Sequence, residues 1–308
     1  MNIETYDKFI STRSKQIKIS GTSLIVTVFG DLITQHGNWI WLGSLIEALE
    51  PLGINERLVR TSVYRLVQND WLIRKKIKKN SYYSLSEEAK RHYDRAALRI
   101  YNAEQSEWDG TWLLVLPVFV EEVKKEQLYK ELTWLGFSPL STGVWAHPSI
   151  AKDSLEDVLV QHDLLEQVII FNSTTYQKTS QTTLKKLVQE RWNLEQLSSD
   201  YQLILDAYRP LLLDVMEKDK PTPQQSFLLR TLFIHEFRRV LIKDHELPES
   251  MLPYDWPGFE TVELAEKLYG LLADNSIDYV QAHLKNPQGN LPSVSRTFWL
   301  RFKKASLV

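Results

Sequence analysis

A polar-faced helix followed at once by a lysine-rich hairpin is the feature that most constrains how this sequence can fold. On a helix with about 100° between successive residues, positions 55–69 separate into an apolar face and a polar face. The apolar face consists of Leu58, Val59, Val63, Leu66 and Val67. The opposite face centres on Arg57, Thr61, Tyr64 and Gln68, with Arg60 and Arg65 at its edges. Two short strands, Trp71–Lys76 and Tyr82–Leu85, are then predicted to enclose a turn around residues 78–81.

The elements predicted around this segment follow the order of a winged helix-turn-helix domain, which we place at residues 20–104. Apolar residues with helical spacing predict a first helix that ends near His36, and a small strand is expected at residues 38–41. A second helix spans residues 42–50, and the third follows Asn55, which is suited to cap it. After the hairpin, a helix from Ser86 to about Asn102 leads out of the domain.

The helix and the hairpin share a strong positive charge. Between Glu56 and Tyr82 there are eight Lys or Arg residues and two acidic residues, a balance of +6, whereas the whole chain has a net charge of −2. Residues 1–100 carry +6 and the remainder −8. A basic segment on a near-neutral protein indicates a DNA-binding module carried by a larger regulator. We therefore expect double-stranded DNA as a partner.

The docking geometry of helix-turn-helix proteins assigns roles to these residues, because the exposed face of the third helix enters the major groove. The side chains expected to reach base edges are Arg57, Thr61, Tyr64 and Gln68. The side chains expected to contact phosphate are Arg60, Arg65, Arg74, Lys75, Lys76, Lys78 and Lys79. The alternative is an ordinary solvated helix beside a hairpin whose lysines only prevent edge-to-edge aggregation.

The rest of the chain is predicted to form two further domains, which makes the fold class α+β. Strands at 111–120, 139–146 and 167–172 alternate with helices at 121–135 and 154–162, which favours a ferredoxin-like middle domain over residues 105–178. Residues 179–308 are predicted to form a helical effector and dimerisation domain. Its helices are expected at 184–197, 201–216, 224–243 and 262–284.

Several functional classes lack their motifs. The segment HEFRR at residues 235–239 has Arg239 where a zinc hydrolase requires a second His, so we expect no metal there. Serine-hydrolase, dinucleotide and P-loop motifs are absent, and the chain has no cysteine. We expect a regulator without enzymatic activity or cofactor. The charged N-terminus and the shortness of the apolar runs lead us to expect a cytoplasmic location without contact with a membrane.

The helix at 224–243 leaves two interpretations open. It is apolar nearly all round but is interrupted by His235, Glu236, Arg238 and Arg239, and buried charges require partners. One interpretation is an internal ion-pair network, and the other is an anion-binding pocket built on arginine. Aromatic residues such as Trp145 and Trp256 could complete such a pocket or simply fill the core.

Several long motifs closely resemble the PaaX-type repressors of phenylacetate catabolism. They are VFGD at 28–31, NERLVRTSVYRLVQNDWL at 55–72, SYYSLSEEAK at 81–90, WDGTWLLVLPVF at 108–119, GFSPLSTGVWAHP at 136–148 and HEFRRVLIKDHELPESMLPYDWPG at 235–258. The resemblance covers residues 20 to 285. It implies a bacterial homodimeric repressor that binds a palindromic operator of phenylacetate-degradation genes and releases it on binding phenylacetyl-CoA.

The resemblance supplies no coenzyme A motif that transfers residue by residue. We therefore hypothesise an effector pocket at His235, Arg238, Arg239, Trp145 and Trp256. One alternative is a repressor of another aromatic-acid pathway that senses a different acyl-CoA or a free acid. An enzyme, such as a nuclease or thioesterase, is disfavoured because no suitably spaced catalytic groups are found. Dimerisation is expected through the helical C-terminal half, since one winged helix covers little DNA.

Overall fold

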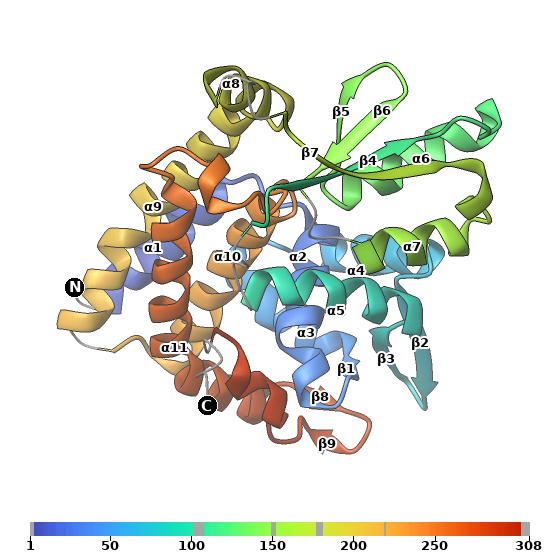
Figure 1. Cartoon of the computed structure of the whole chain (residues 1–308). Coiled ribbons are helices and arrows are strands. Elements are labelled where there is room, and N and C mark those ends of the chain that lie inside the picture. Colours follow the sequence, from blue (N-terminus) through green and yellow to red (C-terminus); the bar gives the residue numbers. More distant parts are fainter. Residues whose placement is uncertain (1–2, 102–107, 149–151, 177–180, 219, 303–308) are drawn as a thin grey trace. The chain divides into compact units, whose positions relative to one another are not determined.

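The computed structural model describes residues 3–101, 108–148, 152–176, 181–218 and 220–302 (Figure 1). By its internal contacts the chain divides into two compact units. The first unit joins residues 1–103 to residues 202–239 and 259–308. The second contains residues 104–201 and 240–258.

The first unit begins with a helix that the sequence analysis did not predict, α1 (Ile3–Gln16). The predicted helices follow as α2 (Gly21–Asp31), α3 (Leu42–Leu49), α4 (Glu56–Gln68) and α5 (Glu87–Tyr101). A 3-10 turn, η1 (Ile33–His36), continues α2, and another, η2 (Glu50–Leu52), continues α3. The predicted N-cap of α4 is confirmed, since Asn55 Oδ1 accepts a hydrogen bond of 2.9 Å from Leu58 N.

A three-stranded antiparallel sheet completes this part of the unit. Its strands are β1 (Ile40–Trp41), β2 (Leu72–Ile77) and β3 (Asn80–Leu85), in the order β1-β3-β2. Strands β2 and β3 are joined by a turn of two residues, Lys78 and Lys79, so the hairpin is longer and its turn tighter than predicted.

The C-terminal helices of the first unit are α9 (Leu194–Glu217), whose first residues belong to the second unit, α10 (Pro223–Leu241) and α11 (Pro257–His283). A small hairpin, β8 (Lys285–Asn286) and β9 (Gly289–Asn290), and the 3-10 helix η5 (Arg296–Leu300) follow α11. The predicted break between two helices at 198–200 is wrong. Residues 194–217 form one helix that includes Ser198, Ser199 and Asp200, and the break between α8 (Gln181–Arg191) and α9 lies instead at Trp192 and Asn193.

The C-terminal helices share their core with the N-terminal elements. Sequence segments 20–104 and 179–308 were predicted as separate domains, but α10 and α11 fall in the same compact unit as α1 to α5. Long-range hydrogen bonds show the connection: Lys285 N donates to Ser44 Oγ at 3.1 Å, and His36 Nδ1 lies 2.8 Å from Pro292 O. These bonds join the segment that follows α11 to α3 and to η1.

A buried ionic cluster around Asp31 anchors the end of α2. Asp31 accepts hydrogen bonds from Arg230 Nε at 3.0 Å and from Arg301 Nη1 at 2.9 Å. It also accepts from the hydroxyls of Tyr101, at 2.7 Å, and Tyr269, at 2.9 Å. Burial alone would raise the pKa of Asp31, but the charges of the two arginines and the bond from Tyr101 hold that pKa below its usual value.

The second unit contains a sheet of four antiparallel strands with two helices between them. Its elements are β4 (Thr111–Leu116), α6 (Glu122–Trp134), β5 (Ser138–Ser141), β6 (Val144–His147), α7 (Lys152–Gln161) and β7 (Ile169–Thr174). The strand order β5-β6-β4-β7 and the βαββαβ connection are those of ferredoxin-like domains. A shared core contains Leu113 and Val115 of β4 with Leu128 and Leu132 of α6.

The prediction of one strand at 139–146 is wrong, because Gly143 adopts a positive φ of 75° and folds this segment into the β5–β6 hairpin. The extra strand completes the ferredoxin-like order. The unit also contains α8 (Gln181–Arg191) and the 3-10 helices η3 (Leu165–Gln167) and η4 (Glu249–Met251). Trp192, just after α8, is buried and donates from Nε1 to Gly136 O at 2.9 Å.

Candidate nucleic-acid interface

Helix α4 buries one face and exposes the face that the sequence assigned to DNA. Its buried residues are Val59, Ser62, Val63 and Leu66. The six residues proposed to contact DNA are all exposed: Arg57, Arg60, Thr61, Tyr64, Arg65 and Gln68. Leu58, which was predicted on the apolar face, is 37% exposed, and Ser62 takes a buried position instead. The small Ser62 side chain fits there because it lies directly against Gly21 at the start of α2.

The charged side chains on α4 differ in how they are held. Arg60 forms an exposed ion pair with Glu56 one turn earlier, at 2.6 Å, so its charge is partly offset. In the described part of the chain, Arg57 and Arg65 form no ion pair. The Thr61 hydroxyl donates to Arg57 O at 2.8 Å, which leaves its oxygen able to accept a hydrogen bond from outside. Arg57 and Arg65 are therefore the α4 arginines best able to bind an external anion or base edge.

The β2–β3 hairpin presents the remaining predicted cations. Arg74, Lys75, Lys76, Lys78 and Lys79 are all exposed. The Arg74 guanidinium donates to Ser81 Oγ at 2.9 and 3.2 Å, which orients it across the hairpin. Lys78 adopts a positive φ of 52°, a conformation that favours Gly or Asn in a tight hairpin turn.

Short hydrogen bonds fix the base of the hairpin to the end of α4. Trp71 N donates to Leu66 O at 2.8 Å, and Ser86 N donates to Trp71 O at 3.0 Å. The Ser86 hydroxyl donates to Asp70 O at 2.6 Å and accepts from Ala89 N at 3.1 Å, which also caps α5. The exposed face of α4 and the lysines of the hairpin are thus held in one orientation to each other.

Of the residues hypothesised to bind an effector, three lie on α10 in the first unit. His235 is buried, and its Nδ1 lies 3.2 Å from Thr27 Oγ1 on α2. Burial, and then the charges of Arg238 and Arg239, lower the pKa of His235 to about 3, so the imidazole is neutral. Arg239 is exposed.

Arg238 is a buried cation without a counter-ion among the described residues. Its Nη2 donates to Ser23 O at 3.3 Å and to Ser23 Oγ at 3.2 Å, and its Nε has no hydrogen-bond partner in the described part of the chain. Burial lowers the pKa of Arg238. By contrast, Glu236 pairs with Arg13 of α1 at 2.5 Å and accepts from Tyr208 at 2.6 Å. The internal ion-pair interpretation therefore holds for Glu236, whereas Arg238 is held by Ser23.

Trp145 and Trp256, the other two hypothesised effector residues, lie in the second unit and are packed in its interior. Trp145 stacks on Tyr129 with ring centroids 5.0 Å apart. Trp256 meets Tyr201 edge to face at 5.8 Å, and Tyr201 in turn donates to Asp244 at 2.5 Å. Both tryptophans thus have the core packing that was the alternative to a ligand cleft.

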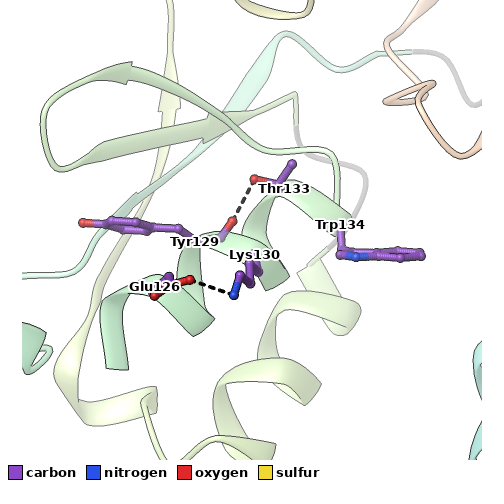
Figure 2. Close-up of a pocket in the computed structure, with 5 residues that line it drawn as sticks. All are labelled: Glu126, Tyr129, Lys130, Thr133 and Trp134. Carbon is purple, nitrogen blue, oxygen red and sulfur yellow. Dashed lines mark hydrogen bonds and ion pairs between the residues drawn. The ribbon is translucent and has the colours of Figure 1, made fainter. Parts of the chain in front are cut away.

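One surface hollow in each unit was compared with the hypothesised effector residues. One, of about 430 Å³, lies on α6 in the second unit and is lined by Glu126, Tyr129, Lys130, Thr133 and Trp134 (Figure 2). Lys130 Nζ pairs with Glu126 Oε1, one turn earlier on the same helix, at 2.8 Å (Figure 2). The other, of about 360 Å³, lies in the first unit between α1 and the α3–α4 turn. None of the five hypothesised effector residues lines either hollow.

Two further observations concern metal-ion sites and membrane-spanning helices. Within the ranges that the structure describes, no group of three or more His, Asp or Glu side chains is arranged to hold a metal ion. No described helix combines the length and apolar character needed to cross a membrane.

Sequence reasoning missed α1 and the α2 side chains that contact α10. The signal for α1 was present, since Tyr6, Phe9 and Ile10 have helical spacing and pack inward. Ser23 and Thr27 are also one helical turn apart, but nothing in the sequence indicated that this turn would face α10.

The fold and the exposed surface define a class: a multidomain protein with a cationic helix and hairpin in one unit and a ferredoxin-like domain in the other. Comparison with known proteins makes this specific. The chain belongs to the PaaX family, as the motifs predicted. Three family models match it: PaaX-like protein at residues 20–89, PaaX protein central Cas2-like domain at 105–185, and PaaX-like protein C-terminal domain at 192–282.

Relatives support the same assignment. The chain is 35% identical over 297 residues to the transcriptional repressor PaaX of Escherichia coli (strain K12), covering 96% of this chain and 94% of that protein. Among solved structures, the uncharacterized protein Rv0674 from Mycobacterium tuberculosis has a TM-score of 0.52 and 20% identity. That match covers 80% of this chain and 94% of the other, and it supports the fold alone.

Proposed function

We propose that this chain is a transcriptional repressor of phenylacetate-degradation genes that binds a palindromic operator as a homodimer. Membership of the PaaX family and the 35% identity to a protein named as a transcriptional repressor support a regulator rather than an enzyme. We further propose that residues 20–104 act as a winged helix-turn-helix domain. The order of α2, α3, α4 and the β2–β3 hairpin supports this proposal.

The observation that carries the proposal is the uniform exposure of the polar face of α4 beside the lysines of the hairpin. Arg57 is exposed and without an ion pair in the described residues, as a side chain that donates two hydrogen bonds to guanine must be. Lys78 lies at the hairpin turn, where a point charge can reach phosphate without reading sequence. Base recognition and phosphate attraction are thus assigned to different side chains, and this separation is testable.

Gel-shift titrations on a phenylacetate-degradation promoter test both assignments. Arg57→Ala is expected to cost about 1–3 kcal/mol and to relax the preference at one base pair, because one bidentate contact is lost. Lys78→Ala is expected to weaken specific and nonspecific DNA alike and to reduce the salt slope by about 1. Lys267→Ala, an exposed change of the same charge on α11, is the control and should leave binding unchanged. If Arg57→Ala and Lys78→Ala both bind DNA like the control, the proposed docking is wrong.

The proposed effector is phenylacetyl-CoA, which on binding lowers the affinity for the operator. What supports a site at α10 is Arg238, a buried guanidinium with no carboxylate partner among the described residues, beside the exposed Arg239. Since Arg238 is bonded to Ser23 on α2, an anion that captured Arg238 would remove a contact with the DNA-binding elements. Reciprocity requires the effector to bind more weakly to the DNA-bound protein, typically by about 1–3 kcal/mol.

Calorimetry of phenylacetyl-CoA against the wild type, Arg238→Ala and Arg239→Ala tests this site, after circular dichroism shows each variant to be folded. The expected result is weaker binding in at least one variant, because the two side chains point about 100° apart on their helix. If both variants bind phenylacetyl-CoA with unchanged affinity, the two arginines do not bind the effector and their role is structural. A thermal-shift panel with phenylacetate and other acyl thioesters would reveal a different effector by a larger stabilisation.

A further inference from the structure

We infer that β7 is the dimerisation edge of this protein, pairing antiparallel with β7 of a second copy to join two four-stranded sheets into one. This inference rests on the proposed homodimeric repressor and adds where the two chains meet. It places the interface in the ferredoxin-like domain, whereas the sequence analysis favoured the helical C-terminal half.

The two outer strands of the sheet are unlike each other. The order β5-β6-β4-β7 leaves β5 and β7 at the edges (Figure 1). Strand β5 contains Pro139, which cannot donate a backbone hydrogen bond, and its pairing is irregular between Pro139 and Ser141. Ser138 of β5 also donates to Arg191 O of α8 at 2.8 Å. Features of this kind usually prevent an edge strand from pairing with a strand of another chain.

Strand β7 has none of these protections. It pairs with β4 over six consecutive residues without a register shift, so its outer row of backbone groups is regular. The segment from Gln167 to Tyr176 contains no charged residue and no proline. A long, regular, uncharged outer strand is the arrangement that binds another strand.

Apolar side chains on both faces of β7 remain exposed to solvent. Ile170 pairs with Val115, which lies in the core under the helices, so Ile170 faces the helical side; it is 36% exposed. Ile169 and Phe171 face the other side of the sheet and are 41% and 48% exposed. Phe119, whose backbone N donates to Gln167 O beside the start of β7, is 71% exposed. A partner strand would bury apolar surface on both faces of the sheet.

The absence of charge on β7 fits a second copy of the chain as the occupant, in keeping with the proposed homodimer. In a pair of identical antiparallel strands the two-fold axis passes perpendicular to the sheet, and each residue meets a counterpart from the same sequence. A charged residue near the axis would face its own like charge, which destabilises cross-strand pairs. The absence of charge from residues 167–176 removes this repulsion, while it gives a charged partner nothing to recognise.

The symmetry also fixes a feature that an experiment can detect. Directly opposed residues point to the same face, whereas neighbours along a strand point to opposite faces. One residue of β7 must therefore lie opposite its own copy, with Cα atoms about 4.5–5.5 Å apart, which is within the range for a disulfide. The chain has no cysteine, so single cysteine variants give an unambiguous readout.

The experiment is oxidative cross-linking of six variants of the full chain, each with one residue from 169 to 174 changed to cysteine. The expected result is a cross-linked dimer formed efficiently at one position and poorly at its immediate neighbours. Sedimentation velocity of Phe171→Lys should show a monomer, because two introduced lysines would meet near the axis. Val123→Lys is the matched control, since Val123 is 90% exposed on α6 in the same domain, and it should remain a dimer.

The outcomes separate this inference from the proposed function. A wild-type dimer that persists in Phe171→Lys, with no efficient cross-link at any of the six positions, overturns the β7 interface and leaves the repressor proposal intact. A wild-type monomer at micromolar concentration, with and without operator, overturns both the homodimer and its interface. If Phe171→Lys does not fold, the cross-linking series alone decides.

Discussion

Removing the negative charge of Asp31 should destabilise this protein more than any ordinary surface change. Asp31 is 1% exposed and lies between the guanidinium groups of Arg230 and Arg301, which are 0% and 7% exposed. Burial raises the pKa values of Tyr101 and Tyr269, so these neighbours stay neutral and contribute only hydrogen bonds. Among the residues that the structure describes, Asp31 is thus the one anion bonded to these two buried arginines.

The size of the effect follows from this charge balance. Asp31→Asn leaves two buried cations without a counter-ion, and breaking such a pair typically costs about 3–5 kcal/mol. For a unit of this size, that corresponds to a fall in Tm of roughly 6–20 °C. Arg230→Met should cost less, because it leaves Asp31 paired with Arg301 and the cluster neutral.

Chemical unfolding followed by circular dichroism at neutral pH measures these differences. Asp274→Asn, an exposed change of the same kind on α11, should shift stability by less than about 0.5 kcal/mol. The stabilisation by Asp31 is present above the usual carboxyl pKa and is lost only as pH falls through its lowered folded pKa. Equal stability of Asp31→Asn and its control, or a greater loss in Arg230→Met than in Asp31→Asn, would refute the charge-balance reasoning.

Three further predictions concern local features. Because the folded pKa of His235 is lowered to about 3, the unfolded chain takes up a proton first on acidification. Stability should therefore fall below pH ~6.5 by up to about 1.4 kcal/mol per pH unit. His235→Gln should flatten this slope between pH 6 and 4, whereas the exposed-site change His92→Gln should not. Asn55→Ala should lower the free energy of unfolding by about 1 kcal/mol, because it removes the N-cap of α4. Asn55→Ser keeps a hydrogen-bond acceptor and should largely preserve stability. Equal losses in the two variants would contradict the capping role. Lys78→Asn should stabilise the hairpin by up to about 1 kcal/mol, because asparagine tolerates the positive φ of this position. The same change should weaken DNA binding, because it removes a positive charge. A loss of stability would argue against backbone strain at this turn.

Most helices and strands could be predicted because their signals are local. The face separation of residues 55–69 and the turn chemistry around Gly53 are properties of a few neighbouring residues, and α4 forms where they indicate. The middle domain was predicted less well, since Pro139–Ala146 reads as one strand until Gly143 is given its positive φ. Helix α1 was missed although its apolar residues have helical spacing. The charged residues of this segment were used only to argue against contact with a membrane.

The proposed DNA-contacting residues could be chosen from the sequence because they are defined by exposure, which helical periodicity predicts. The hypothesised effector residues could not be placed in this way. His235 and Arg238 lie on α10, but their surroundings are set by Ser23 and Thr27, more than 200 positions earlier in the chain. No local pattern encodes such a contact.

By itself, the sequence determined the periodic elements, the basic surface of α4 and the hairpin, and membership of the PaaX family, because each depends on neighbouring residues or on motif identity. Only the tertiary structure decided that the C-terminal helices share a core with α2. It also decided that Asp31 meets an arginine 270 positions away and that β7, rather than β5, is the open edge of its sheet. The physical reason is that burial, ion pairing and strand order depend on segments that are distant in sequence and become neighbours only when the chain folds.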